Sequence, residues 1–129
     1  MDKNCVLLLK SIVDGSENVF SLEGRIEKSE DAIKLFYREE GANTQVIFQT
    51  GKVCVNREGD YSLRIPLVEG LITKGELELN GNTGELDIFT HGLSYSLSNG
   101  QLTARLRYDI LLGDNAQEME LLMQADIRE

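Results

Sequence analysis

The sequence predicts an all-β protein in which about eight to ten antiparallel strands form a barrel with meander connections. The run Gln101–Leu112 alternates apolar and polar residues without a break, which is the period of a strand with one buried face. It is also long, since strands usually have about five or six residues, and such length suits a barrel or a strongly coiled sheet. Glycine-containing clusters divide the rest of the chain at short intervals, as turns between antiparallel strands do.

The predicted turns combine glycine with Asn, Asp or a polar neighbour, residues that tolerate the positive φ of tight reversals. They are Asp14-Gly15, Glu40–Asn43, Thr50-Gly51, Glu58–Asp60, Asn80–Thr83, His91-Gly92, Asn99-Gly100 and Gly113–Asn115.

Between these turns the alternation predicts about ten strands, of which one or two merge or carry a bulge. The segments are Cys5–Val13, Asn18–Lys28, Ala32–Glu39, Thr44–Gln49, Lys52–Arg57, Tyr61–Leu67, Ile72–Leu79, Glu85–Thr90, Leu93–Leu97, Gln101–Leu112 and Glu118–Ile127.

Two segments also have helical features. Ser29–Asp31 could cap a turn that leads into Ile33 and Tyr37, and Gln117–Ala125 contains good helix formers. We favour strands in both places, because in the second segment the period of two continues to Ile127 and burial usually overrides weak propensity.

Length and charge limit the classes of function. Residues 1–129 make one domain, and the net charge is −9. Binding to nucleic acid or to an anionic membrane surface draws on lysine and arginine, so the acidic excess argues against both. A cationic ligand or a basic protein partner is compatible with this charge.

The N-terminal region and the cysteines predict a cytoplasmic location. Cys5 and Cys54 are too few for a disulfide framework, and the apolar run at Cys5–Leu9 is too short for a signal core. We expect no membrane-spanning segment, because no stretch approaches the ~20 apolar residues needed.

Several spaced motifs resemble the YwiB-like family of uncharacterised bacterial proteins, over nearly the full length. They are SLEGRI (Ser21–Ile26), FYREE (Phe36–Glu40), VCVNREG (Val53–Gly59), GELDIFT (Gly84–Thr90) and GQLTARLRYDI (Gly100–Ile110). The resemblance implies a closed or nearly closed antiparallel barrel of the lipocalin-like (calycin) kind. It implies no established activity, so it transfers no functional residue.

The candidate ligand-binding residues are polar or aromatic and lie in phase with buried apolar neighbours. Arg57 follows Val53 and Val55, and a buried charge needs a carboxylate, a bound anion or water. Lys10 likewise lies in phase with its apolar neighbours. The alternative is an arginine at a strand end that reaches solvent, with tyrosines that fill a core. The candidate set is Tyr37, Arg57, Tyr61, Tyr95 and Tyr108.

Catalytic and metal-binding patterns are absent from the sequence, so we expect no enzyme, no cofactor and no metal site. His91 is the only histidine and reads as a surface residue in a turn. The cysteines lack CxxC spacing, and no phosphate-binding or nucleophile motif occurs. A hydrolase that uses carboxylates such as Glu39 or Asp87 would need two acids facing each other in a cavity.

Two functions from different classes follow. The first is a barrel that binds a small apolar or amphipathic molecule, because a barrel of this size is either filled by side chains or holds one small ligand. The alternative is a non-enzymatic interaction module that uses its acidic outer face or an edge strand, with a protein partner or a second copy of the chain.

Overall fold

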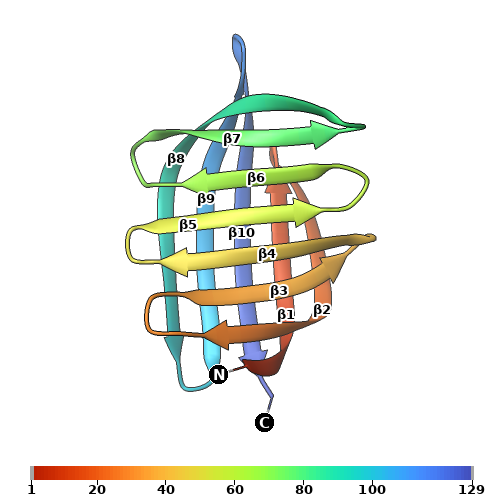
Figure 1. The fold of residues 1–129 in the computed structure, drawn as a ribbon. Helices are drawn as coiled ribbons and strands as arrows, with labels where there is room; N and C mark the ends of the chain where they lie inside the picture. The colour runs from red at the N-terminus through yellow and green to blue at the C-terminus, as the bar shows by residue number, and fades with distance from the viewer. Residues whose placement is uncertain (1, 129) are drawn as a thin grey trace.

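A computed structural model describes residues 2–128, and these form ten β-strands (Figure 1). The pairing order β1-β10-β9-β8-β7-β6-β5-β4-β3-β2 closes on itself, and every ladder is antiparallel. The predicted all-β antiparallel barrel with meander connections is therefore confirmed. The strands are β1 (Asp2–Val13), β2 (Ser16–Lys28), β3 (Ile33–Glu39), β4 (Ala42–Gln49), β5 (Lys52–Glu58), β6 (Ser62–Leu67), β7 (Ile72–Leu79), β8 (Asn82–Ser98), β9 (Gln101–Leu112) and β10 (Asn115–Ile127).

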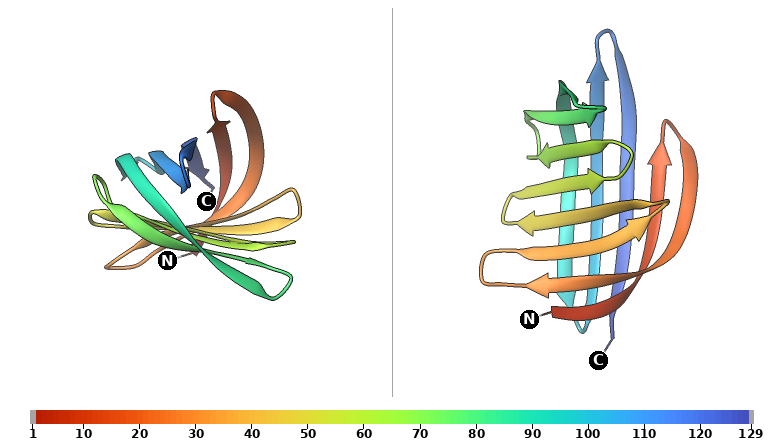
Figure 2. Two further views of the ribbon diagram at one scale, coloured as in Figure 1. Left: turned by 90° about the horizontal axis from the view of Figure 1, so that it is seen from above. Right: turned by 45° about the vertical axis from the view of Figure 1, so that its right-hand side comes forward.

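The barrel consists of two layers whose strands cross steeply (Figures 1 and 2). Strands β3 to β7 form one layer, and β9, β10 and most of β1 run across it in the other. The long strands β2 and β8 bend and contribute to both layers. As a result β2 pairs with β1 over residues 16–27 but with β3 only over residues 24–28.

Gly24 makes the bend of β2 sterically feasible. A Cβ atom at this position would lie 2.7 Å from the carbonyl oxygen of Phe36 and 3.3 Å from Sγ of Cys5. Because real Cβ atoms do not approach backbone oxygen this closely, the bend at position 24 requires a residue without a side chain.

Strand β8 corrects one sequence prediction. His91-Gly92 is not a turn, because β8 runs unbroken from Asn82 to Ser98. The pairing with β9 slips between Thr90 and Gly92, which is a β-bulge. The two segments predicted on either side are thus one bent strand, and His91 lies on its exposed surface.

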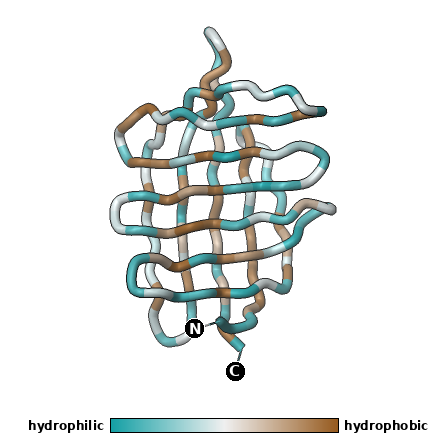
Figure 3. The backbone as a smooth tube through the Cα atoms, in the orientation of Figure 1, coloured by the Kyte–Doolittle hydropathy of each residue, from teal (hydrophilic) through white to brown (hydrophobic). Residues whose placement is uncertain are grey.

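Apolar and polar residues alternate along the strands (Figure 3), and successive side chains of a strand point to opposite sides of the barrel wall. In β9, Leu102 and Leu106 are fully buried, and Tyr108 and Ile110 belong to the same core as Leu121 of β10. The period of two therefore places these side chains inward as predicted. Gln117–Ala125 lies inside β10, so the strand interpretation of that segment is confirmed.

Tight hairpins connect most strands. At Asn99-Gly100, for example, φ is +52° and +74°, the backbone of a two-residue turn with positive φ at both positions. Such turns let pairing begin at once, so β10 starts at Asn115 and not at Glu118. Within residues 2–128 no helix is long and apolar enough to cross a membrane.

Candidate functional site

A polar row crosses the interior at the end of the barrel near the hairpins Glu40-Gly41 and Asn80-Gly81. Cross-strand pairing aligns Tyr37 of β3 with Thr44 of β4, Thr44 with Arg57 of β5, and Arg57 with Leu63 of β6. Directly paired residues point to the same side of a sheet, so these side chains share the inner face. Each residue of this row lies an even number of positions along its strand from a buried apolar residue, as Arg57 does from Val55. Its side chain therefore points to the same inner side.

Tyr37 and Tyr108 are buried phenols in this region. Tyr37 is 8% exposed and Tyr108 of β9 is 2% exposed. Burial raises the pKa of both, and the neighbouring Glu39 carboxyl and Tyr108 raise the pKa of Tyr37 further, although a hydrogen bond with the Thr44 side chain lowers it. Both hydroxyls are therefore neutral and able to donate a hydrogen bond at neutral pH.

Arg57 holds a buried donor without a partner. Its guanidinium carbon lies 4.3 Å from the centroid of the Tyr61 ring, which covers it from the loop between β5 and β6. Its Nη1 atom is buried and has no hydrogen-bond partner within residues 2–128. Glu39 is the nearby carboxyl: burial and the adjacent Glu40 raise its pKa, and Arg57 lowers it. No ion pair joins Glu39 to Arg57 in the described part of the chain, so the buried Nη1 donor has no carboxylate partner there.

Thr90 is a second buried group without a partner, and the sequence did not reveal it. Its side chain is fully buried at the bulge of β8, opposite Tyr108, and its Oγ1 atom has no hydrogen-bond partner among the residues that the structure describes. The hint in the sequence is the break of alternation after Thr90, where His91-Gly92 interrupts the apolar phase.

The structure thus brings together four of the five predicted residues and separates the fifth. Tyr37, Arg57, Tyr61 and Tyr108 surround the polar end of the interior. Tyr95 packs elsewhere: its ring lies 5.0 Å from that of Phe48 at the other end of β4.

Lys10 lies on the outer face. It shares a side with Leu8 and Ile12, as predicted, but the buried residues of β1 are Cys5, Leu7 and Leu9, so that side faces outward. Its Nζ atom forms an ion pair of 2.6 Å with Glu17. The period of two in β1 is as predicted, but both faces of this strand carry apolar residues, so the sequence alone does not say which face is inside.

The residues considered for chemistry are dispersed. Asp87 pairs with Lys74 on the exposed outer surface, whereas Glu39 is on β3, so these two acids do not face each other across a cavity. Nε2 of His91 lies 2.9 Å from Oδ2 of Asp109 on the outer surface. Both cysteines are free thiols, and burial raises the pKa of each. Among the described residues no group of three or more potential ligands could hold a metal ion.

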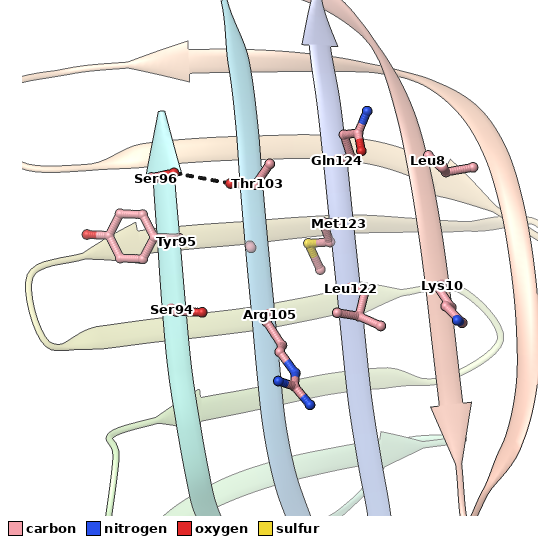
Figure 4. Close-up of a pocket in the computed structure, with 11 residues that line it drawn as sticks. Leu8, Lys10, Ser94, Tyr95, Ser96, Thr103, Arg105, Leu122, Met123 and Gln124 are labelled. Carbon is pink, nitrogen blue, oxygen red and sulfur yellow. Dashed lines mark hydrogen bonds between the residues drawn. The ribbon is translucent and has the colours of Figure 1, made fainter. Parts of the chain in front are cut away.

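The largest pockets described lie on the outside of the barrel. One, of about 510 Å³, lies over β1, β8, β9 and β10, with Leu8 and Leu122 among its apolar residues and Lys10 and Arg105 among its charged ones (Figure 4). A second, of about 480 Å³, lies over β2 to β5 and includes Arg25 and Phe36, which are in cation–π contact. The middle of the interior, in contrast, is filled by side chains that are less than 2% exposed.

Comparisons with known proteins agree with the fold and name no activity. The crystal structure of the ywiB protein from Bacillus subtilis matches with a TM-score of 0.84 at 21% identity, and the match covers 99% of this chain and 94% of that one. No curated protein matches. The model of a family described as a domain of unknown function, DUF1934, matches residues 10–122. The likeness to the YwiB-like family is thereby confirmed, and the chain belongs to the DUF1934 family.

Proposed function

We propose that this protein binds a small amphipathic molecule at the polar end of the barrel, with the anionic group of the ligand on Arg57. The observation that carries the proposal is the buried, unpartnered Nη1 atom of Arg57. A buried charge without a partner costs free energy, and an anion that accepts hydrogen bonds from the guanidinium removes that cost.

The neighbours of Arg57 suit such a ligand. Tyr37 and Tyr108 offer neutral hydroxyls, and Leu63 and Met119, which pair with Arg57 and Tyr108 respectively, offer apolar surface. Because the middle of the barrel is filled, we infer that the ligand lies at this end and not in a central cavity. Displacement of the Tyr61 ring, which is 37% exposed, would open the way to Arg57.

Two dyes with the same ring system test the proposal. 8-Anilinonaphthalene-1-sulfonate carries an anionic group, and N-phenyl-1-naphthylamine lacks it. Fluorescence titration should show tighter binding of the sulfonate, although the chain carries a net charge of −9. Arg57→Gln should weaken sulfonate binding by roughly tenfold, about 1.4 kcal/mol, and change binding of the neutral dye little.

The matched control addresses the outer pocket. Leu122→Gln places an amide in that pocket and should leave binding of both dyes unchanged. Loss of binding in Leu122→Gln but not in Arg57→Gln would place the dye outside the barrel and contradict the proposal. Equal affinity for the two dyes would contradict the proposal that Arg57 binds an anionic group of the ligand.

The alternative function, a non-enzymatic interaction module, is favoured by an unpaired edge on β2. Residues 16–23 pair with β1 on one side, and no other strand of the described chain pairs with them on the other. Glu17 and Glu23 flank this edge, which suits a basic peptide added as an extra strand. A peptide of alternating lysine and valine should slow hydrogen exchange at residues 16–23, and unchanged exchange at saturating peptide would remove this alternative.

The free thiols Cys5 and Cys54 support a cytoplasmic location as part of the proposal. Neither proposed function needs a metal ion or a cofactor.

A further inference from the structure

The second half of β8 is an unpaired strand edge. Strand β7 pairs with β8 only over residues 82–89, whereas β9 pairs with it as far as Ser98. Residues 92–98 therefore have β9 on one side and no paired strand on the other within residues 2–128. Figure 4 shows β8 as the outermost strand of this layer, with Ser94, Tyr95 and Ser96 along it.

One hydrogen bond shows which backbone groups face the free side. The N–H of Leu93 donates to Oε1 of Glu69 at 3.1 Å, and Glu69 belongs to the loop before β7 and not to β9. Leu93 N–H thus points away from β9. Because backbone groups alternate along an antiparallel strand, the N–H and C=O groups of Tyr95 and Leu97 face the free side too.

The strand itself carries none of the usual protection against pairing, and the Glu69 carboxylate covers the N–H of Leu93 at one end of it. Exposed edges commonly carry charged residues or proline, and residues 92–98 contain neither, although the chain as a whole is strongly acidic. The edge of β2 carries Glu17 and Glu23, so it repels a second copy of this acidic chain. The edge of β8 is the one at which two such chains can approach without bringing like charges together on the pairing strands.

The sequence of this edge reads the same in both directions. Leu93-Ser94-Tyr95-Ser96-Leu97 is a palindrome centred on Tyr95. In a two-fold antiparallel pair centred there, Tyr95 lies opposite Tyr95 of the second copy, Ser94 opposite Ser96, and Leu93 opposite Leu97. Directly opposite side chains interact across strands, so each residue meets its own kind: serine on the outer face, leucine and tyrosine on the inner face.

We propose that two copies of this chain pair through residues 93–97 of β8. The layers that contain β9 and β10 in the two copies then form one continuous sheet. The two Tyr95 residues exchange a pair of backbone hydrogen bonds, and the N–H of each Leu97 donates to the carbonyl of Leu93 in the second copy. The N–H of Leu93 keeps its bond to Glu69. The Phe48 ring, 5.0 Å from that of Tyr95, holds the centre of the edge in place before association. This inference is independent of Arg57 and of ligand binding.

Sedimentation equilibrium over about 1 μM to 1 mM, the range in which small interfaces associate, tests the pairing. The wild-type mass should rise from 14.4 kDa towards twice that value. Added salt should favour the dimer, because it screens repulsion between the two acidic chains. A wild-type chain that stays monomeric over this range would overturn the proposal.

A pair of double variants tests the register. Ser94→Glu/Ser96→Glu places carboxylates opposite each other across the two-fold axis and should abolish the dimer. Ser94→Glu/Ser96→Lys places a carboxylate opposite an ammonium group at both positions and should restore it. Within one chain position 94 faces Arg105 and position 96 faces Thr103, so neither variant introduces a like-charge acidic pair with β9.

The three samples together give a clear result. Pairing centred on Tyr95 predicts a dimer for the wild type, a monomer for the Glu/Glu variant and a dimer for the Glu/Lys variant. The restored dimer would also show that substitution at these two positions does not prevent folding. Identical behaviour of the two variants, whether monomeric or dimeric, would overturn it.

Discussion

Two rows of inward side chains cross the layer of β4, β5 and β6, and only four positions separate them along each strand. The apolar row contains Phe48, Val53 and Leu67, each at most 1% exposed. The polar row contains Thr44 and Arg57 beside Leu63, and it includes a buried donor without a partner. The same strands thus build a tightly packed end and an unsatisfied end of one interior.

The two rows differ in what they contribute to stability and to function. Burial of apolar side chains is the main favourable contribution to folding, so the apolar row should account for more of the stability. The polar row opposes folding through desolvation, and nothing in barrel closure requires an arginine at position 57. A residue that is costly to the fold and faces a mouth of the barrel is where we expect a ligand.

The largest expected effect is in the apolar row. Phe48→Ala removes a fully buried ring and its contact with Tyr95, which should lower the free energy of unfolding by about 3–5 kcal/mol. Urea unfolding measures it. Thr44→Val, at the matching position of the polar row and on the same strand, keeps the shape and should change stability by about 1 kcal/mol or less. A Thr44→Val loss as large as that of Phe48→Ala would remove the contrast between the rows.

The sequence predicted which residues point inward but not how the rows align. Alternation in β5 correctly put Arg57 in phase with Val55, because the side-chain period of a strand is a local property. Tyr95 is equally in phase, yet it belongs with Phe48, because the offset between distant strands depends on turn lengths and on the bulge at Thr90. Whether Arg57 has a carboxylate partner also depends on Glu39 of β3, which lies eighteen positions away in the sequence. The local pattern around Arg57 does not show whether the two side chains meet.

A smaller effect of opposite sign is expected in the polar row. Arg57→Met keeps much of the side-chain volume and removes the buried donor without a partner, so without ligand it should raise the free energy of unfolding by about 1 kcal/mol. The same urea experiment measures it. Arg64→Met, on the exposed outer face of β6, is the matched control and should stay within about 0.5 kcal/mol of the wild type. Destabilisation by Arg57→Met beyond that of the control would show that the guanidinium is already satisfied in the folded chain.

The smallest expected change in stability is the dependence on pH that Glu39 causes. Burial raises the pKa of this carboxyl above its ordinary value of 4.5, with Glu40 adding to the rise and Arg57 opposing it. Between the ordinary pKa and the raised one the folded chain binds more protons than the unfolded chain, so stability should fall as the pH rises through that window. Glu39→Gln removes the titrating group, and its thermal midpoint should exceed that of the wild type at neutral pH by more than at pH 4.5.

The exposed carboxylate of Glu78 provides the control for the loss of one negative charge. Glu78→Gln should shift the midpoint by a similar amount at both pH values, because its side chain is in solvent in the folded and unfolded chain alike. A pH-dependent gain confined to Glu39→Gln assigns the cost to burial of Glu39 beside the polar row. The Arg57→Met background should enlarge this gain, because the charge that opposes the rise in the Glu39 pKa is then gone. A gain of equal size in both single variants would instead assign the effect to the overall acidity of the chain. It would contradict an energetic cost at the polar end of the barrel.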